Sequence, residues 1–177
     1  MLGRAPGVLL ALLVAALAFQ ARAQTLEASV KANYLVRFAA FVQWPDQAFA
    51  GPDAPLVICV VGRTGFGPAL AEAAAGQSAH GRPIRVRTVN APALTRDCHV
   101  LYVGGGMGER WPLWVAETRH LLVVTDQRTS TRRGAVHFDL HEGRLRFHVD
   151  QNAARAAGLS INARMLALAL SVTGGRS

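Results

Sequence analysis

Residues 56–61, Leu-Val-Ile-Cys-Val-Val, are the feature that most limits how this chain can fold. The run is apolar at every position, whereas a strand with one face in water alternates apolar and polar side chains. Uninterrupted apolar strands belong to parallel sheets that are covered on both faces. The run therefore predicts a buried strand in a layered α/β protein.

Three further segments have the pattern of strands, and two have the pattern of helices. The predicted strands are Pro83–Val89, Cys98–Val103 and Leu121–Thr125, and the predicted helices are Pro68–Ala75 and Glu109–Arg119. Alternating strands and short helices are typical of an α/β layered domain. We expect a single α/β domain over residues 24–177, with a mixed sheet of about four mostly parallel strands plus a C-terminal β-hairpin, flanked by helices.

The segment Lys31–Pro45 has the pattern of an amphipathic helix. Its apolar positions recur at steps of three and four residues, which places them on one helical face. These positions are Val30, Tyr34, Phe38, Phe41 and Val42. Pro45 disfavours α geometry at Trp44, so the helix should end there. We expect Phe38 and Phe41 to lie in the core, and Lys31 to lie largely off this face.

Residues 135–150 predict a β-hairpin with Glu142-Gly143 as its two-residue turn. This turn makes one face apolar, with the pairs Leu140–Leu145, Phe138–Phe147 and Val136–Val149. The other face is polar, with the pairs His141–Arg144, Asp139–Arg146 and His137–His148. A shift of one residue would mix the two faces, so the pattern fixes the register.

The C-terminal segment predicts two short helices. The first follows Asp150 and stops at Gly158, and the second starts near Asn162, whose side chain is suited to cap a helix N-terminus. The apolar face expected for the second helix consists of Met165, Leu166, Leu168, Ala169 and Val172.

The first 23 residues have the three parts of a signal peptide. Arg4 provides a positive charge, residues 8–19 form a short apolar run, and Ala21-Arg22-Ala23 is a cleavage site of the A-x-A type. The run is too short for a resident transmembrane helix, and no later stretch reaches about 18 consecutive apolar residues. We expect cleavage after Ala23, export to the periplasm and no transmembrane span in the mature chain. An uncleaved membrane anchor is the alternative.

The chain carries a formal net charge of +8 at pH 7, and Lys31 is its only lysine. A basic surface favours an acidic partner or an anionic membrane face. Nucleic acid is not an expected partner, because the chain is exported and has no basic helix interleaved with aromatic residues.

Cys59 and Cys98 are the only cysteines, and each lies in a strand-like apolar run. Two cysteines in an oxidising compartment typically form a pair, so we expect a disulfide, with two buried free thiols as the alternative. In the chain-entropy model, a bridge closing a loop of this length stabilises the fold by roughly 4 kcal/mol. Without a Cys-x-x-Cys spacing, the cysteines do not predict a metal site.

Two glycine-rich segments, residues 62–67 and 104–108, each join a predicted strand to a predicted helix. The first lacks the Gly-Lys-Ser/Thr of a P-loop, and in the second Glu109 stands where a dinucleotide-binding loop has its third glycine. Both are therefore expected to be turns. The chain also has no nucleophile elbow, no His-Glu-x-x-His and no paired-carboxylate motif, so neither catalysis nor a cofactor is expected.

Three side chains on the polar hairpin face are candidate metal ligands. His137 and His148 are directly opposite, with Cβ atoms roughly 5 Å apart, so they could chelate zinc or copper beside Asp139. The simpler interpretation is a solvated face with an Asp139–Arg146 pair. We favour the solvated face, because a third ligand is not assured.

Arg37, Trp44 and Arg164 are the candidate residues for binding a partner or ligand. Arginine and aromatic residues dominate the energetics of interfaces. Together with Tyr34 and Phe41 they could line a pocket or interface between the first helix and the last. An aromatic stripe at helical spacing is more often part of the core, so the sequence leaves both roles open.

An ordered set of short motifs runs from Lys31 to about Leu170. They are Phe41–Pro45 (Phe-x-x-Trp-Pro), Phe66-Gly67, Cys98–Leu101 (Cys-His-x-Leu), Gly134–Phe138 with Glu142-Gly143, and Ala153–Ile161. In this order they resemble the YfiR-like family of bacterial periplasmic regulators.

The resemblance implies a non-catalytic protein that binds the periplasmic part of an inner-membrane diguanylate cyclase or sensor kinase and holds its output low. Self-association as a homodimer is left open. The residues themselves leave two alternatives, a periplasmic small-molecule or metal-binding carrier that uses the hairpin face, and an exported hydrolase.

Overall fold

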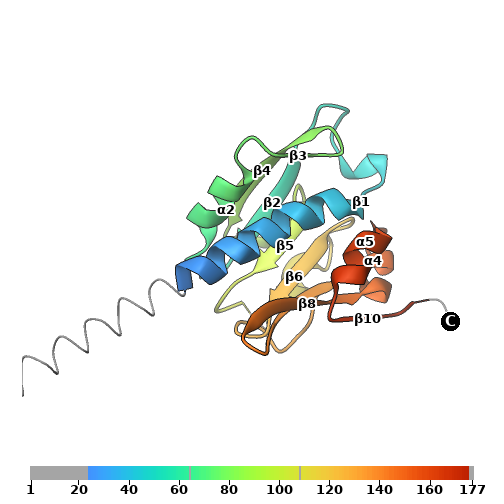
Figure 1. The fold of residues 1–177 in the computed structure, drawn as a ribbon. Helices are drawn as coiled ribbons and strands as arrows, with labels where there is room; N and C mark the ends of the chain where they lie inside the picture. The colour runs from blue at the N-terminus through green and yellow to red at the C-terminus, as the bar shows by residue number, and fades with distance from the viewer. Residues whose placement is uncertain (1–23, 64, 108, 176–177) are drawn as a thin grey trace, which may run out of the picture.

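The computed structural model describes residues 24–63, 65–107 and 109–175, which form one eight-stranded sheet and a separate two-stranded sheet (Figure 1). The strands are β1 (Val42–Gln43), β2 (Leu56–Val61), β3 (Ser78–Ala79), β4 (Arg82–Val89), β5 (Val100–Val103), β6 (Leu122–Asp126), β7 (Val136–His141), β8 (Arg144–Asp150), β9 (Ser160–Ile161) and β10 (Ser171–Thr173). The helices are an N-terminal helix (24–41), α2 (Gly67–Ala74), α3 (Trp111–Val115), α4 (Gln151–Ala156) and α5 (Ala163–Leu168), with 3-10 turns η1 (Asp46–Ala48) and η2 (Pro92–Thr95).

The large sheet has the order β10-β8-β7-β6-β5-β2-β4-β3, and its five central strands, from β7 to β4, are parallel. The predicted α/β class is confirmed. The sheet has eight strands rather than about four plus a hairpin. The strands that the sequence missed, β3 and β10, have two and three residues, which is too short for an alternating pattern to reveal them.

The predicted signal peptide, residues 1–23, lies outside the described residues. Within the described part of the chain, no helix is long and apolar enough to cross a membrane.

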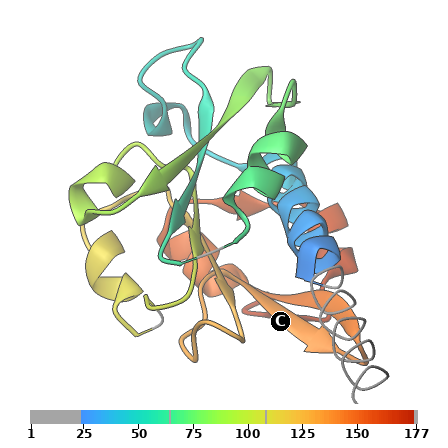
Figure 2. The same cartoon turned by 90° about the vertical axis from the view of Figure 1, so that its left-hand side faces the viewer.

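Both faces of the sheet are covered, as the apolar run of β2 predicts (Figure 2). Alternate residues of β2 enter different cores: Ile58 and Val60 pack beneath the N-terminal helix and α2, whereas Cys59 and Val61 pack beneath α3. The first core is the larger, and it also receives Met165 of α5. The uninterrupted apolar pattern therefore reflects burial on two sides.

The N-terminal helix ends earlier than predicted and is rotated relative to the expected face. It stops at residue 41, because Val42 and Gln43 pair with Ile161 and Ser160 of β9 instead of continuing the helix. Phe38 lies in the core as predicted, but Phe41 is only partly buried. The fully buried positions of the described helix are Ala32, Leu35, Phe38 and Ala39.

The hairpin register is confirmed at all six predicted pairs. Phe138 and Phe147 are buried opposite one another, and the Phe38 ring packs against both. The side-chain contacts on the polar face differ from the prediction. Asp139 is opposite Arg146 in the register, but its carboxylate contacts the His148 side chain instead.

The two C-terminal helices are confirmed, and their caps are those expected. The Asp150 carboxylate accepts hydrogen bonds from the first turn of α4, Gly158 has a left-handed φ of 75°, and the Asn162 side chain caps α5. Of the face predicted for the second helix, Met165 is buried, whereas Leu168 is exposed and Val172 belongs to β10. The predicted helix Glu109–Arg119 is shorter, because the chain turns after α3 ends at Val115.

A disulfide joins Cys59 of β2 to Cys98, which lies just before β5. The two strands are neighbours in the sheet, and the bridge belongs to the core beneath α3. Cross-linking adjacent strands restricts the unfolded chain more than it changes the folded one.

The described parts of the two glycine-rich segments form turns, as expected, and they lie against each other. The backbone of Arg63 donates to the Gly105 carbonyl oxygen at 2.8 Å, and Gly105 donates back to Arg63 at 3.0 Å. Gly62 has a φ of 85°, and a Cβ atom there would lie 2.8 Å from the Gly105 oxygen. Glycine is therefore required at position 62 by both conformation and space.

The hairpin register predicts unequal effects of two neighbouring substitutions. Phe138→Asp places an unpaired carboxylate in the core, and we expect it to lower the free energy of unfolding by more than about 3 kcal/mol. Asp139→Ala removes one side of a partly exposed ion pair and should cost at most about 1 kcal/mol. Urea unfolding of both variants tests this, and equal losses would contradict the assignment of the faces.

Candidate functional site

A groove lies between the N-terminal helix, β8 and α5. Its volume is about 470 Å³. It is lined by Val30, Asn33, Tyr34, Arg37, Arg146, Ala167 and Leu168, and we call it the helix groove.

The helix groove combines positive charge with an exposed apolar side chain. Arg37 is exposed and Arg146 is half-buried, and neither guanidinium forms an ion pair or hydrogen bond with the described residues. No acidic side chain of the described residues lines the groove. Leu168 is 55% exposed beside them. Unpaired arginines next to an exposed leucine and a tyrosine have the composition of a binding surface.

The structure separates the three binding residues predicted from the sequence. Arg37 lines the helix groove, Arg164 is exposed at the start of α5 outside its lining, and Trp44 belongs to a different cluster. Arg146 is the charged groove residue that was not predicted from the sequence. The hairpin pattern placed it opposite Asp139 as an ion-pair partner, but Asp139 contacts His148 instead, which leaves the Arg146 guanidinium free.

Trp44 has a structural role in this arrangement. Its indole N–H donates to the carbonyl oxygen of His120 at 2.9 Å, which connects the segment after β1 to the start of β6. The indole packs edge-on against the rings of His80 and His99, with centroids 6.5 and 6.1 Å away. These contacts within the chain explain why the Trp44 side chain is half-buried, and no partner protein is needed to explain it.

His99 is held as a neutral side chain by its backbone contacts. Its Nδ1 accepts the backbone N–H of Val57 at 3.1 Å, so Nε2 carries the proton and donates to the Ala48 oxygen at 3.1 Å. The Phe49 ring stacks on the imidazole at 4.4 Å. Burial lowers the pKa of His99, because the protonated form would be poorly solvated.

The hairpin histidines are engaged in contacts within the protein. The Nε2 of His148 lies 3.0 Å from Asp139, and its Nδ1 lies 2.6 Å from the Ser171 hydroxyl. His137 is buried and contacts the Thr125 hydroxyl. Burial lowers the pKa of His137, and the hydrogen bond from His148 lowers the pKa of Asp139. Within the described residues, no group of three or more acidic, histidine or cysteine side chains is arranged to hold a metal ion.

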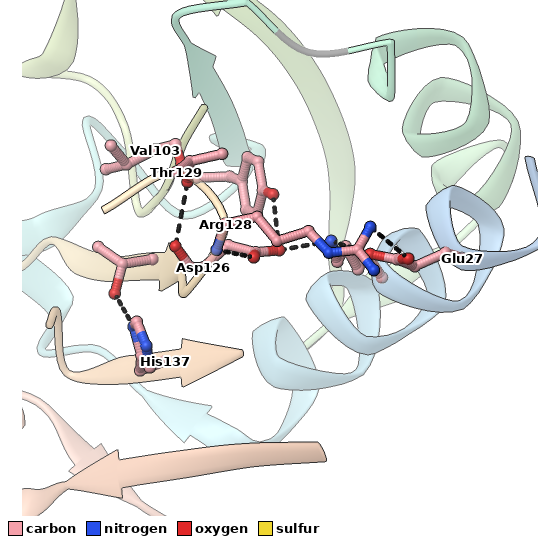
Figure 3. A network of polar contacts seen from close by, with 9 residues as sticks. Glu27, Val103, Asp126, Arg128, Thr129 and His137 are labelled. Atoms are coloured by element: carbon pink, nitrogen blue, oxygen red, sulfur yellow. Dashed lines mark hydrogen bonds and ion pairs between the residues drawn. The ribbon is translucent and has the colours of Figure 1, made fainter. Parts of the chain in front are cut away.

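A network of charged and polar side chains surrounds the carboxyl end of β6 (Figure 3). Its centre is Asp126, which is 2% exposed and forms an ion pair with Lys31 of the N-terminal helix. Lys31 also contacts Glu27 at 2.5 Å, and Glu27 accepts from Arg128 at 2.8 Å. The Tyr102 hydroxyl donates to Asp126 at 3.3 Å, and burial together with this carboxylate raises the tyrosine pKa.

Lys31 is the buried charge that the sequence analysis missed, because helical spacing placed it off the apolar face. It is 9% exposed. The available signal was its chemistry: it is the only lysine in a chain whose other long cationic side chains are arginines. An ammonium is a compact point charge, which suits a site between two carboxylates.

The network predicts a large cost for breaking one buried partner. Lys31→Met leaves Asp126 buried without its cation and should lower the free energy of unfolding by about 3–5 kcal/mol. Lys31→Met combined with Asp126→Asn should be more stable than Lys31→Met alone, because the uncompensated charge is removed. Arg96→Met, which breaks the exposed Arg96–Glu117 pair, is the control and should cost less than about 1 kcal/mol. Additive losses in urea unfolding would show that Lys31 and Asp126 are not coupled.

The lowered pKa of His99 predicts how stability depends on pH. The unfolded chain takes up a proton near pH 6.5, whereas the folded chain resists protonation until lower pH. The stabilisation is therefore complete above about pH 6.5 and is lost as the pH falls through the lowered pKa. His99→Asn keeps an acceptor for the Val57 N–H and should flatten the decrease in unfolding free energy between about pH 7.5 and 5.5. His141→Asn, at the exposed hairpin tip, is the control, and an equal change of slope in both variants would refute the assignment.

A family model described as YfiR/HmsC-like matches residues 28–170, which span most of the N-terminal helix, every strand of the sheet except β10, and α5. No curated protein matches the chain. The match to this family supports a regulatory role in the periplasm in general terms. The chain belongs to the YfiR/HmsC-like family.

Proposed function

We propose that this protein is a non-catalytic periplasmic regulator that binds an inner-membrane signalling protein and represses it. The receptor is a diguanylate cyclase or a sensor kinase. The observation that carries the proposal is the helix groove, where two unpaired arginines and an exposed leucine meet without an acidic neighbour. Family membership supports the regulatory part of the proposal.

The groove fits a receptor segment that carries a carboxylate beside an apolar side chain. The fork of donors on Arg37 or Arg146 matches a carboxylate in a bidentate arrangement. Leu168 and the Tyr34 ring provide the apolar contact next to them. An arginine that becomes buried against a partner contributes about 2–4 kcal/mol to binding, measured as the loss on truncation.

Repression without chemistry requires preference for one receptor conformer. A ligand changes an equilibrium only through its differential affinity for the two states. Moving a receptor from 1:99 to 99:1 in favour of the inactive state needs about 5.5 kcal/mol of difference. Two arginines that contact a carboxylate only in the inactive receptor supply free energy of this order.

The carrier alternative loses its structural basis at the hairpin face. Both ring nitrogens of His148 already contact protein atoms, and His137 is buried against Thr125. The helix groove remains the better-supported binding surface.

Charge reversal in the groove tests the proposal. Arg37→Glu combined with Arg146→Glu should leave the fold and export intact, because neither guanidinium has a partner among the described residues. In a host cell that lacks the native gene, the variant should fail to lower cyclic-di-GMP or kinase output, whereas the wild-type gene restores low output. Binding to the purified receptor ectodomain should weaken by about a hundredfold or more.

The matched control reverses two arginines elsewhere. Arg85→Glu combined with Arg119→Glu changes the net charge equally at exposed positions outside the groove and should repress normally. Arg164→Glu tests separately whether the surface extends to the start of α5. Full repression by the folded groove variant would exclude this surface. Unchanged cyclic-di-GMP and kinase outputs after deletion of the whole gene would exclude the regulator proposal itself.

A further inference from the structure

The order in which successive parallel strands are added to the sheet reverses at one place, between β2 and β5. The chain passes from β2 to its neighbour β4 on one side, returns to β5 on the other side of β2, and then continues outward to β6 and β7. The reversal lies at the carboxyl ends of β2 and β5, where backbone hydrogen bonds between Arg63 and Gly105 join the segments that follow the two strands. In open α/β sheets, ligands bind at this type of reversal.

A cleft of about 660 Å³ opens beside this position, between the N-terminal helix and α2. Figure 2 shows these two helices side by side on the same face of the sheet. We call it the switch-point cleft. Its lining includes Lys31, Arg63, Phe66, Glu72, Tyr102 and Arg128.

Side chains from separate segments converge on the cleft because the backbone beneath them is fixed. Arg63 follows β2, and its backbone is held by the paired hydrogen bonds to Gly105 after β5. Arg128 follows β6, and its backbone N–H donates to Asp126 at 2.9 Å. A fixed backbone lowers the entropic cost of binding a ligand between the two arginines.

The lining of the cleft carries charges of both signs, and it includes the exposed carboxylate of Glu72 as well as Glu27. Lys31 and Arg128 neutralise Glu27 and Asp126 through the ion pairs of the network. Arg63 is exposed and has no ion pair or side-chain hydrogen bond with the described residues. Arg128 directs Nη1 to Glu27, so most of its five N–H donors remain available.

The rings of Phe66 and Tyr102 form a largely buried apolar wall of the same cleft, and the two residues are 5% and 4% exposed. Their centroids are 4.8 Å apart, and both side chains are held in the core beneath α2. A ligand that contacts this wall and the arginines needs an uncharged part and an anionic end. This combination of an apolar wall with a few convergent polar groups is typical of small-molecule sites.

We propose that the switch-point cleft binds a small organic anion, with its carboxylate or phosphate between Arg63 and Arg128 and its uncharged part against Phe66 and Tyr102. Guanidinium groups recognise both anions through paired, charge-assisted hydrogen bonds. The site is distinct from the helix groove and goes beyond the proposed function. The two lie on different sides of one helix, which carries Lys31 in the cleft and Arg37 in the groove.

Calorimetric titration of the exported, purified protein tests the site without any receptor. The probes are succinate and benzoate for carboxylates, and inorganic phosphate and phenyl phosphate for phosphates. We expect at least one probe with an uncharged part to bind saturably with a Kd below about 1 mM. Comparison of the two pairs identifies the anion, and backbone amide resonances of Gly65 and Phe66 should shift on binding.

Two sets of variants locate the binding. Arg63→Gln removes an unpartnered guanidinium, should leave the protein folded, and should weaken binding at least about tenfold. Arg37→Gln combined with Arg146→Gln removes the two groove arginines and should leave the Kd unchanged, as should Arg85→Gln on β4. The proposal is overturned if no probe binds below that Kd, or if the groove variant rather than Arg63→Gln loses binding. Neither result would bear on receptor repression, which is measured with the groove variants in cells.

Discussion

The ion pair between Lys31 and Asp126 joins the first helix to the end of β6 inside the protein. Asp126 ends β6 and Lys31 belongs to the helix, so one buried contact connects the beginning of the described chain to its centre. Two charges removed from water are costly to separate, which makes the contact selective for one arrangement. The arrangement matters because the same helix forms one wall of both the groove and the cleft.

The apolar core residues and the exposed charge of the first helix lie on different sides of it. The side toward the sheet carries Leu35 and Phe38, which fill the core, with Lys31 at one end. Arg37 lies away from the core and remains exposed. The same helix lines both the cleft, through Lys31, and the helix groove, through Arg37.

Much of the fold follows from local patterns, while the site depends on contacts between distant segments. The alternation of apolar and polar residues around Phe138 and Phe147 predicts the hairpin register. The capping residues Asp150 and Asn162 stand at the starts of the last two helices, as expected. The end of the first helix could not be predicted in this way, since Val42 pairs with Ile161, far along the chain. Lys31 and Arg146 were misplaced for the same reason: their surroundings are set by β6 and by the choice of His148 over Arg146 as the partner of Asp139.

The burial of Lys31 gives the protein an internal reporter of its own opening. A protease that cleaves only after lysine has a single site in this chain, within the first helix. Cleavage requires an extended, accessible backbone, so the intact helix on its sheet resists the enzyme. When opening and closing are fast relative to cleavage, the proteolysis rate measures the fraction of molecules in which the helix has left the sheet. The free energy of the opening that exposes Lys31, whether local or global, can therefore be followed without labels.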